Sequence, residues 1–420
     1  MKKIRVTVIG AGSVFTPELV QLLLDRNLAV EELVLMDIDR QRLDILSSFA
    51  ERQIAQAGAN TKVKSVDSYR DAIPGSDYIC IQARIGGNHM RTLDEELARK
   101  YHIPFVETVS IPGLGAFLRS VPVYDEIADL IKDHAPNAMV MNFSNPAGAL
   151  TAYLHAKGIT QAVGVCNSPI GFASTVAELL NVPSESVWMN WKGLNHLTVV
   201  DQLLVDGKDV MTEVIEKASE WSSGFPFSRS VIDDTGLGLS SYFQYYFHSG
   251  RRMRELLEKT VSRGQEVIDL ERKLLTEYAR QNTVSIPDLL KSRGGYRYSE
   301  VVVDLIESIL TDNHKIHYVN VQNNGTISGL PDDTVVEVPA IVENGAILPL
   351  KTGELPVLVK PLVLTMATVY KYWVSAALAN SLADLRRSLL IHPLFPDAEQ
   401  SEQILDEFFD LNKEFVHPYY

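Results

Sequence analysis

A short apolar run that ends in a glycine turn is the feature that most constrains the fold of this chain. The run from Ile4 to Ile9 leads into Gly10-Ala11-Gly12-Ser13, and a helical pattern begins at Thr16. A strand, a Gly-x-Gly turn and a helix form the unit with which doubly wound sheets bind dinucleotides, because the glycines let the backbone turn sharply and approach a pyrophosphate at the helix N-terminus. The sequence therefore predicts an N-terminal Rossmann-type domain.

Two further positions bear on which nucleotide this turn would bind. Phe15 holds the place of the third glycine in the usual fingerprint, so the turn alone is a weak signal. Asp37 follows the second expected strand, where a carboxylate accepts hydrogen bonds from ribose hydroxyls and repels a 2′-phosphate. An aspartate here could instead cap the next helix. We expect NAD rather than NADP, held by Gly10, Gly12, Ser13, Val14, Phe15 and Asp37.

Short apolar strands alternate with helices through the first 170 residues. Strands are expected at 4–9, 33–36, 77–82, 138–142 and 162–165, and helices at 16–25, 40–57, 91–101 and 121–132. This alternation is typical of an α/β fold with a doubly wound, mostly parallel sheet. Beyond residue 170 helical patterns dominate, with long runs at 251–280, 362–379 and 382–390 and strand-like pieces at 316–321 and 334–338. We expect an NAD-binding Rossmann domain at 1–170 and a larger, mainly helical α+β domain at 171–420 for substrate, metal and oligomerisation.

Charge and cysteine content narrow the classes of partner. The net charge is −14, which argues against nucleic acid or an anionic membrane as the main partner. The N-terminus runs directly into a strand pattern, and we expect neither a signal peptide nor a membrane span. The two cysteines, Cys80 and Cys166, lie in different contexts, so a disulfide framework is not expected. These features favour the cytoplasm and a small-molecule substrate.

A cysteine and a histidine stand where ligands of an α/β sheet collect. Cys166-Asn167-Ser168-Pro169 follows a strand end, and Gly193-Leu194-Asn195-His196 comes thirty residues later. A thiolate and an imidazole together suit a borderline divalent metal. By themselves they are also explained by a small buried cysteine and a structural histidine.

The motifs, taken in order, resemble glycoside hydrolase family 4, the NAD- and metal-dependent glycosidases. The resemblance covers nearly the whole chain. It rests on Gly10-Ala11-Gly12-Ser13-Val14-Phe15-Thr16-Pro17-Glu18-Leu19, Arg91-Thr92-Leu93-Asp94-Glu95, Asn142-Phe143-Ser144-Asn145-Pro146-Ala147, Cys166-Asn167-Ser168-Pro169, Gly193-Leu194-Asn195-His196, Ser241-Tyr242-Phe243-Gln244-Tyr245-Tyr246 and Val335-Val336-Glu337-Val338-Pro339.

The resemblance implies roles for single residues. Cys166 and His196 match two metal ligands, usually for Mn²⁺, and Tyr242 matches the catalytic base. The residues that match substrate-binding positions are Arg91, Asn145, Asn167 and Arg263. Cys-Asn-x-Pro looks like the form found in 6-phospho-β-glucosidases, whereas the α-glucoside branch usually has Cys-Asp. The implied enzyme is closest to a 6-phospho-β-glucosidase that forms homodimers or homotetramers.

The reaction that the resemblance implies is hydrolysis assisted by a retained redox cofactor. NAD⁺ oxidises C3 of the sugar, which makes the C2 proton acidic, and a divalent metal stabilises the resulting enolate. Tyr242 removes that proton, the glycosidic oxygen leaves, water adds at C1 and the hydride returns. A tyrosine base needs its pKa lowered from about 10, and the metal and Arg263 are expected to do this.

Several assignments have simpler structural alternatives. Tyr245 and Tyr246 compete with Tyr242 for the role of base. Arg263 is also explained by a surface pair with Glu266, and Asn167 by a helix cap.

One stretch departs from the family pattern. Members acting on 6-phospho sugars are expected to have a segment like Gly-Gln-Glu-Thr-Thr-Gly-x-Gly-Gly, but this chain reads Phe105-Val106-Glu107-Thr108-Val109-Ser110-Ile111-Pro112-Gly113. That leaves open whether the sugar is phosphorylated, and no matched carboxylate stands out as general acid. Two other functions also stay open: an NAD-dependent dehydrogenase of the lactate or malate type, and an NAD-sensing regulator that needs no metal.

Overall fold

The computed structural model describes residues 3–108, 110–220, 226–395, 397–417 and 419. Val109, inside the segment that departs from the family pattern, lies outside the described residues.

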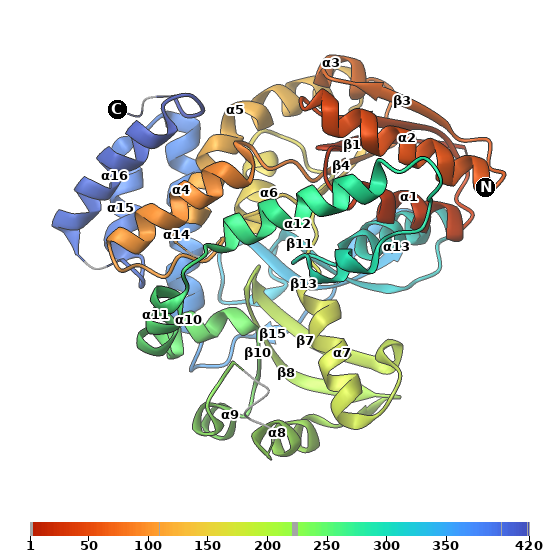
Figure 1. Cartoon of the computed structure of the whole chain (residues 1–420). Coiled ribbons are helices and arrows are strands. Elements are labelled where there is room, and N and C mark those ends of the chain that lie inside the picture. The colour runs from red at the N-terminus through yellow and green to blue at the C-terminus, as the bar shows by residue number, and fades with distance from the viewer. Residues whose placement is uncertain (1–2, 109, 221–225, 396, 418, 420) are drawn as a thin grey trace.

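The first part of the chain forms a six-stranded parallel sheet in the order β3-β2-β1-β4-β5-β6. This part, coloured red to yellow, lies in the upper part of Figure 1. Its strands are β1 (Ile4–Ile9), β2 (Val30–Met36), β3 (Lys62–Val66), β4 (Tyr78–Ile81), β5 (Met139–Asn142) and β6 (Ala162–Gly164). The helices between them are α1 (Thr16–Asp25), α2 (Arg40–Gln56), α3 (Tyr69–Ala72), α4 (Gly87–Lys100), α5 (Ile111–His134) and α6 (Ala147–Ala156). This strand order is that of a dinucleotide-binding Rossmann sheet, so the predicted fold class is confirmed.

The sheet continues beyond β6 with antiparallel strands. The order runs from β6 through β11 (Ile316–Gln322), β13 (Val335–Glu343), β7 (Val187–Leu194) and β8 (Leu197–Val205) to β10 (Gly238–Leu239). The shorter strands are β9 (Lys208–Asp209), β12 (Ile327–Ser328), β14 (Ala346–Pro349) and β15 (Gly353–Glu354). The strand-like pieces expected near 316–321 and 334–338 are confirmed, while the hairpin of β7 and β8 was not predicted.

The junction between the two kinds of pairing depends on one glycine. Gly164 at the end of β6 pairs with Asn320 of β11. A Cβ at Gly164 would lie 2.6 Å from the Oγ1 of Thr151 and 2.8 Å from the Cβ of Asn320. The close approach of the two strands therefore requires glycine at this position.

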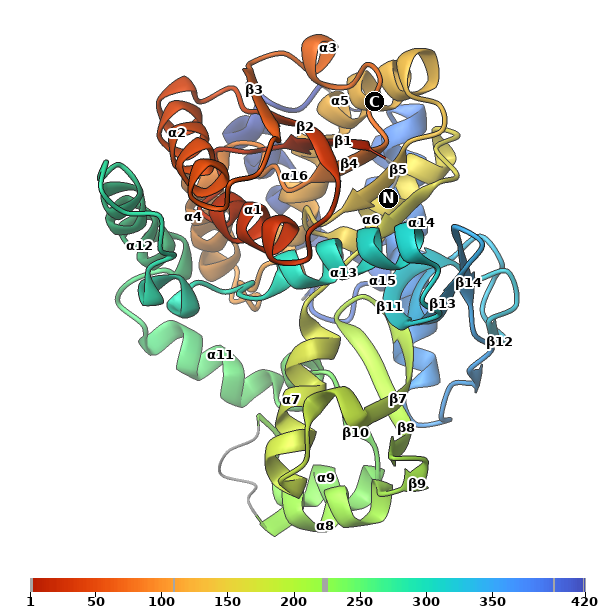
Figure 2. The same ribbon diagram turned by 90° about the vertical axis from the view of Figure 1, so that its right-hand side faces the viewer.

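Helices make up most of the remaining chain (Figure 2). They are α7 (Ser168–Leu180), α8 (Met211–Glu220), α9 (Arg229–Thr235), α10 (Gln244–Phe247), α11 (Ser249–Glu258), α12 (Arg263–Tyr278), α13 (Tyr298–Thr311), α14 (Lys360–Ala379), α15 (Leu382–Ile391) and α16 (Ala398–Asn412). The single run expected at 251–280 is wrong, because Lys259 is extended and Ser262 caps a new helix by accepting from the Gln265 amide at 3.1 Å.

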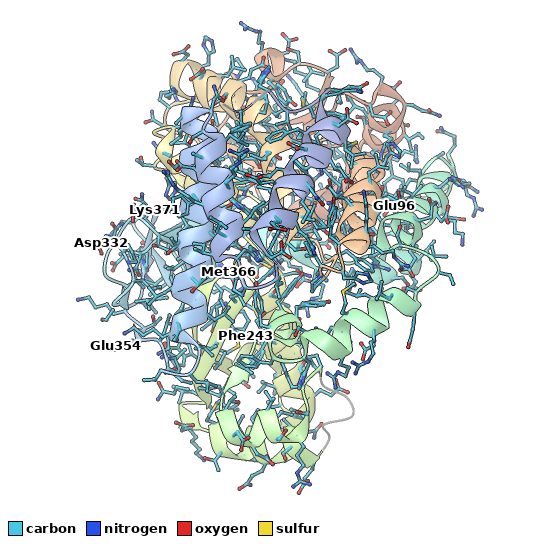
Figure 3. The ribbon with its side chains drawn as sticks, turned by 90° about the vertical axis from the view of Figure 1, so that its left-hand side faces the viewer. Glu96, Phe243, Asp332, Glu354, Met366 and Lys371 are labelled. Carbon is cyan, nitrogen blue, oxygen red and sulfur yellow. The ribbon has the colours of Figure 1, made fainter. Side chains whose placement is uncertain are left out.

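Helix α14 is the one helix in the described part of the chain that is long and apolar enough to span a membrane, by length and composition alone. Its mean hydropathy is 1.3 over an 18-residue window of which 39% is buried. Met366 and Trp373 are fully buried, whereas Lys371 reaches Asp333 with an Nζ–Oδ2 distance of 2.6 Å. Met366 and Lys371 are labelled in Figure 3. The helix thus packs one face into the protein core and leaves another face partly open.

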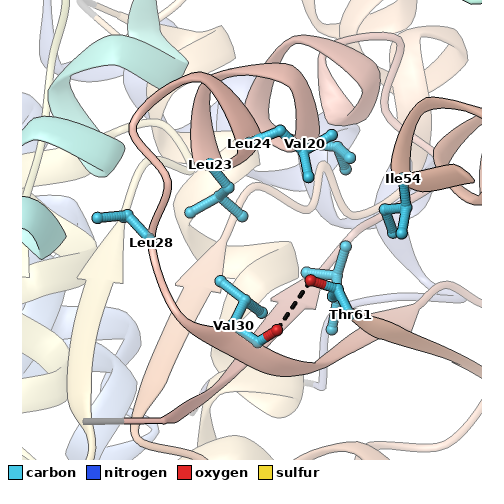
Figure 4. A pocket seen from close by; sticks show the side chains of 8 residues that line it. Val20, Leu23, Leu24, Leu28, Val30, Ile54 and Thr61 are labelled. Atoms are coloured by element: carbon cyan, nitrogen blue, oxygen red, sulfur yellow. Dashed lines mark hydrogen bonds between the residues drawn. The ribbon is translucent and has the colours of Figure 1, made fainter. Parts of the chain in front are cut away.

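A small apolar hollow lies between α1, α2 and the starts of β2 and β3 (Figure 4). Its volume is about 10 Å³, and the Thr61 hydroxyl at its rim donates to the Val30 carbonyl at 2.8 Å. It lies at the opposite ends of the strands from the glycine turn. Its size and lining mark it as a packing gap in the core rather than a ligand site.

Candidate active site

The glycine turn adopts the backbone conformation that the dinucleotide fingerprint requires. Gly10 has a φ of +86°, and a Cβ there would lie 2.6 Å from the Cα of Ala83. The turn is fixed to the sheet because the amides of Gly10 and Ala11 both donate to the Met36 carbonyl at 2.9 Å. The start of α1 therefore lies directly over the carboxyl end of β1, where a pyrophosphate binds in this fold.

Asp37 lies against this turn. Its Oδ2 accepts from the Gly12 amide at 2.7 Å, and a Cβ at Gly12 would come within 2.7 Å of the same oxygen. Burial raises the pKa of the Asp37 carboxyl, an effect opposed by the amides of Asp39 and Gly12. Asp39, not Asp37, caps α2, by accepting from the Arg42 amide. The helix-cap alternative for Asp37 is therefore wrong.

Phe15 replaces the third glycine with an aromatic contact. It is the N-cap of α1 and makes no side-chain capping hydrogen bond. Its ring meets the ring of Tyr298 edge-on, with 4.8 Å between centroids, and packs 3.5 Å from where a Cβ of Gly295 would lie. The amides at the start of α1 are therefore not capped by this side chain, which fits an anion-binding helix end.

Cys166 and His196 are brought together from different parts of the sheet. Cys166 comes two residues after β6, and His196 lies in the turn of the β7–β8 hairpin with a φ of +68°. Both residues are 6% exposed, and 3.7 Å separates Sγ from Nε2. The thirty-residue spacing in the sequence therefore becomes a direct side-chain pair.

The pair has the dimensions of two ligands on one cation. With the bond lengths known for zinc, about 2.3 Å to sulfur and about 2.1 Å to nitrogen, an angle near 110° puts the two atoms about 3.6 Å apart. Burial lowers the pKa of His196 to about 4, which keeps the imidazole neutral. Burial, together with the charge of Glu337, raises the pKa of the Cys166 thiol to about 11. The residues present therefore fit a metal once the thiol loses its proton.

The pair leaves most of a metal's coordination positions to other ligands. Among the described residues, no group of three or more His, Cys, Asp and Glu side chains is placed to hold a metal ion. A metal on Cys166 and His196 would therefore keep open positions, as catalytic rather than structural metal sites do.

Tyr242 covers the imidazole of His196. It sits in a short 3-10 helix, Ser241–Phe243, whose Phe243 is fully buried. The Tyr242 and His196 rings are stacked with 3.8 Å between centroids and 5° between planes. Burial raises the pKa of Tyr242 above its usual value, as do the charges of Cys166 and Glu107, while Arg91 lowers it. A phenolate here therefore needs additional positive charge nearby.

A charged cluster that the sequence did not predict lies beside this pair. Glu107 contacts the guanidinium of Arg84, and its Oε2 is 2.9 Å from Nη1 of Arg91. Burial favours the neutral acid, but the charges of Arg84 and Arg91 outweigh it and hold the pKa of Glu107 well below its usual range. Glu107 is therefore a permanent carboxylate and an unsuitable general acid.

A third arginine ties this cluster to the nucleotide turn. Arg293 contributes to the low pKa of Glu107, and its guanidinium lies 5.7 Å from the Phe15 ring centre. Glu271 accepts from Arg293 at 3.1 Å and from Arg42 at 3.1 Å, while Nε of Arg42 donates to the Gly12 carbonyl at 2.7 Å. Two ion pairs and one hydrogen bond thus link Arg293, through Glu271 and Arg42, to the glycine turn.

Two asparagines lie at the same edge of the sheet. Asn145 follows β5, next to the strand that precedes Cys166, and is half-buried ahead of a cis bond to Pro146. Asn167 is the N-cap of α7 by position but makes no capping hydrogen bond. Its Nδ2 donates instead to the Tyr296 carbonyl at 3.0 Å. The cap alternative for Asn167 is therefore wrong.

Arg263 lies at the start of α12 on a more open surface. Its Nη1 donates to Glu266 at 2.9 Å, both side chains are about 40% exposed, and Nη2 lies 3.4 Å from the Ser292 carbonyl. The expected effect of Arg263 on Tyr242 comes instead from Arg91, whose positive charge lowers the pKa of Tyr242.

The segment that departs from the family pattern is partly helical. Ile111, Pro112 and Gly113 form the first turn of α5, where a proline is well tolerated. Thr108 has a φ of +81°, and its hydroxyl oxygen is 2.5 Å from Nδ1 of His196. The altered segment therefore still reaches the Cys166–His196 pair.

Comparisons with known proteins agree with this geometry. Residues 5–182 match the model of the family 4 glycosyl hydrolases, and residues 191–395 match the model of their C-terminal domain. The chain is 32% identical to a 6-phospho-β-glucosidase of Thermotoga maritima over 98% of this chain and 99% of the relative. It is 27% identical to a maltose-6′-phosphate glucosidase of Clostridium acetobutylicum, over 99% of both chains.

Solved structures give the same result. The Thermotoga maritima enzyme, solved with NAD and glucose-6-phosphate, superposes with a TM-score of 0.94 at 32% identity, covering 99% of this chain and 100% of that one. A form with manganese, NAD⁺ and glucose-6-phosphate gives a TM-score of 0.93. A lactate dehydrogenase of Eimeria maxima, at 15% identity and a TM-score of 0.55, shares the fold alone. The ordered motifs, the Rossmann sheet and these matches together show that the chain belongs to glycosyl hydrolase family 4.

Proposed function

We propose that this protein hydrolyses 6-phospho-β-glucosides, with NAD and Mn²⁺ or another divalent metal as cofactors. The observation that carries the proposal is the Cys166–His196 pair under the Tyr242 ring, at the same sheet edge as the glycine turn. The full-length likeness to a 6-phospho-β-glucosidase that has been solved with NAD, manganese and glucose-6-phosphate supports it.

Each part of the site would then have one task. Gly10, Gly12, Ser13, Val14 and Phe15 would hold the pyrophosphate side of NAD, and Asp37 the ribose. Cys166 and His196 would hold the metal, and Tyr242 would take the proton from C2 of the sugar. The bound cofactors supply a hydride acceptor and a Lewis acid, and the positive charge of the metal favours the phenolate form of Tyr242.

The sugar phosphate would be recognised by arginine. Arg91 is 8% exposed, and its guanidinium forms ion pairs with Glu107 and Glu95. Arg84 and Arg293 add positive charge at the same place, and a buried guanidinium is well suited to a phosphate because its fork matches two oxygens. Asn145 and Asn167 would contact the sugar hydroxyls. Arg263 is the candidate with the least support, since its contacts are with Glu266 and Ser292.

We infer further that the protein works in the cytoplasm as a homodimer or homotetramer. Both cysteines are free, and Cys166 must stay reduced to bind a metal. Leu378 is 49% exposed on α14, and Leu390 is 61% exposed on α15. Such large apolar side chains at the open face of α14 and α15 suit an interface between copies. We also propose that the chain has two domains, an NAD-binding domain at 1–170 and a second domain at 171–420.

The proposal is tested by assay of the purified enzyme with NAD⁺, Mn²⁺ and a thiol. The substrates are 4-nitrophenyl β-glucoside 6-phosphate, its α anomer and both sugars without phosphate. We expect turnover of the β phosphate, with the other three at least tenfold slower. Turnover of an unphosphorylated glucoside at the same rate would overturn the substrate assignment. No turnover of any glucoside with Mn²⁺, Co²⁺ or Ni²⁺ would overturn the activity itself.

A further inference from the structure

Thr108 makes a short polar contact with His196, one of the two proposed metal ligands. Its Oγ1 lies 2.5 Å from Nδ1 of His196, on the side of the ring away from the nitrogen that faces Cys166. Thr108 is 3% exposed, and His196 is 6% exposed. Little water therefore reaches this contact, and among the described residues the side chain of Thr108 is the hydrogen-bond partner of Nδ1.

The backbone of Thr108 has an unfavourable conformation for a threonine. Its φ of +81° lies in the left-handed region, which a β-branched residue rarely adopts. Gly113 makes this possible, because a Cβ there would lie 2.7 Å from the carbonyl carbon of Thr108. The hydroxyl of Ser110 donates to the Pro104 carbonyl and closes the turn. Strain of this kind persists where the surroundings impose it, and it is concentrated at functional sites.

We propose that Thr108 is a positioning residue that accepts a hydrogen bond from Nδ1–H of His196 and so fixes the tautomer whose Nε2 lone pair faces Cys166. A neutral imidazole carries one proton, and a metal can bind only the nitrogen without it. With the proton held at Nδ1, Nε2 stays open toward Sγ at 3.7 Å. Without this contact the proton is free to occupy Nε2 and block the ligand position.

This inference rests on the proposed function in one respect, namely that His196 binds a metal. Hydrogen bonds that orient a histidine ligand are worth about 10- to 100-fold in metal affinity. The tautomer itself does not depend on any metal. The two claims therefore fail separately.

The first measurement is the tautomer of His196 in the metal-free protein. Long-range ¹H–¹⁵N NMR spectra of protein labelled at histidine distinguish a protonated Nδ1 from a protonated Nε2, and the signal that disappears in His196→Gln identifies the residue. We expect Nδ1–H in the wild type and in Thr108→Ser, which keeps the hydroxyl, and a shift toward Nε2–H in Thr108→Val. Nε2–H in the wild type would overturn the proposal, whatever the metal does.

The second measurement is Mn²⁺ affinity, from the EPR signal of free Mn²⁺ without NAD or substrate. We expect Thr108→Val to weaken binding about 10- to 100-fold and Thr108→Ser to restore it to within about threefold. Thr7→Val is the matched control, because Thr7 is fully buried in β1 and its hydroxyl binds Ala72 and Ser76. It should lower the melting temperature without changing Mn²⁺ affinity. Equal Mn²⁺ affinities for Thr108→Val and the wild type would overturn the proposal. Equal Mn²⁺ affinities for Cys166→Ser and the wild type would count against the metal site instead.

Discussion

The aromatic ring of Tyr242 lies flat on the imidazole of His196, with 3.8 Å between centroids and 5° between planes. The stack fixes the phenol relative to the Cys166–His196 pair, although Tyr242 and His196 are far apart in sequence. Burial and the neighbouring Cys166 and Glu107 raise the pKa of Tyr242, so its phenol would be a poor base without added positive charge. The proposed base and the proposed metal ligands therefore form one unit.

The first prediction concerns this unit. Tyr242→Phe keeps the stacked ring and removes only the hydroxyl, so it should lower kcat by about 10²- to 10⁴-fold, the usual contribution of a positioned base. NAD and Mn²⁺ affinities should stay within about threefold, measured by NADH fluorescence displacement and EPR. Tyr245→Phe is the control, because its ring is 6.2 Å from that of Tyr242 and packs on Arg252. A larger loss in Tyr245→Phe than in Tyr242→Phe would move the role of base to Tyr245.

The second prediction concerns the glycine turn. Gly12→Ala would bring a Cβ within 2.7 Å of Asp37, and overpacking of this kind costs about 1–3 kcal/mol. Because the strain falls on the nucleotide site, the Kd for NAD should rise about 10- to 100-fold. The control is Gly171→Ala on α7, where no atom lies within 4 Å of the added Cβ. Equal NAD affinities in the two variants, by isothermal titration, would contradict the assignment of the turn.

The main elements of the site could be predicted because parallel strands bring their carboxyl ends together. Gly10, Asp37, Asn145 and Cys166 each follow a strand, so a pattern read along the sequence already places them at one edge. The Rossmann half was predictable for the same reason. Its strands are short, buried and regularly separated by helices.

The ionic cluster around Glu107 could not be predicted in this way. Glu107 binds Arg84 and Arg91 across a loop and a helix, and Arg293 comes from far along the chain. No local pattern marks such partners, because the pairing is decided by how α4, α12 and α13 pack.

The β7–β8 hairpin was not predicted, although the sequence carries a local signal for it. Val187, Met189 and Trp191 alternate as buried apolar residues, which is the period of a half-buried strand.

The third prediction separates two arginines. Arg91→Lys loses the planar fork that contacts Glu107, so kcat/KM for the 6-phospho substrate should fall about 10- to 100-fold. Arg263→Lys should change it less than about threefold, because its pair with Glu266 is about 40% exposed and such pairs contribute little. Steady-state kinetics of both variants decides the matter. A loss at Arg263 as large as that at Arg91 would assign Arg263 to the substrate site after all.

The fourth prediction concerns stability at low pH. Burial lowers the pKa of His317 to about 4, and the ring binds Ser308 at 2.7 Å. The unfolded chain takes up this proton below a pH of about 6.5 but the folded protein does not, so the stability present above pH 6.5 is lost as the pH falls toward 4. At pH 5 the loss is about 2 kcal/mol. In urea unfolding, the loss of stability between pH 7 and pH 5 should be about 2 kcal/mol smaller in His317→Gln than in the wild type, because His196 remains buried and neutral in both proteins. Equal losses in the two proteins would contradict the buried neutral histidine.

The most direct test of the whole account is the fate of the C2 hydrogen of the sugar. Hydrolysis of 4-nitrophenyl β-glucoside 6-phosphate is carried out in D₂O with catalytic NAD⁺, and the glucose 6-phosphate formed is examined by NMR. If C3 oxidation and proton removal at C2 precede cleavage, the product should carry deuterium at C2, and NADH should not accumulate in proportion to product. A product with only hydrogen at C2, or one NADH for each substrate consumed, would contradict the account.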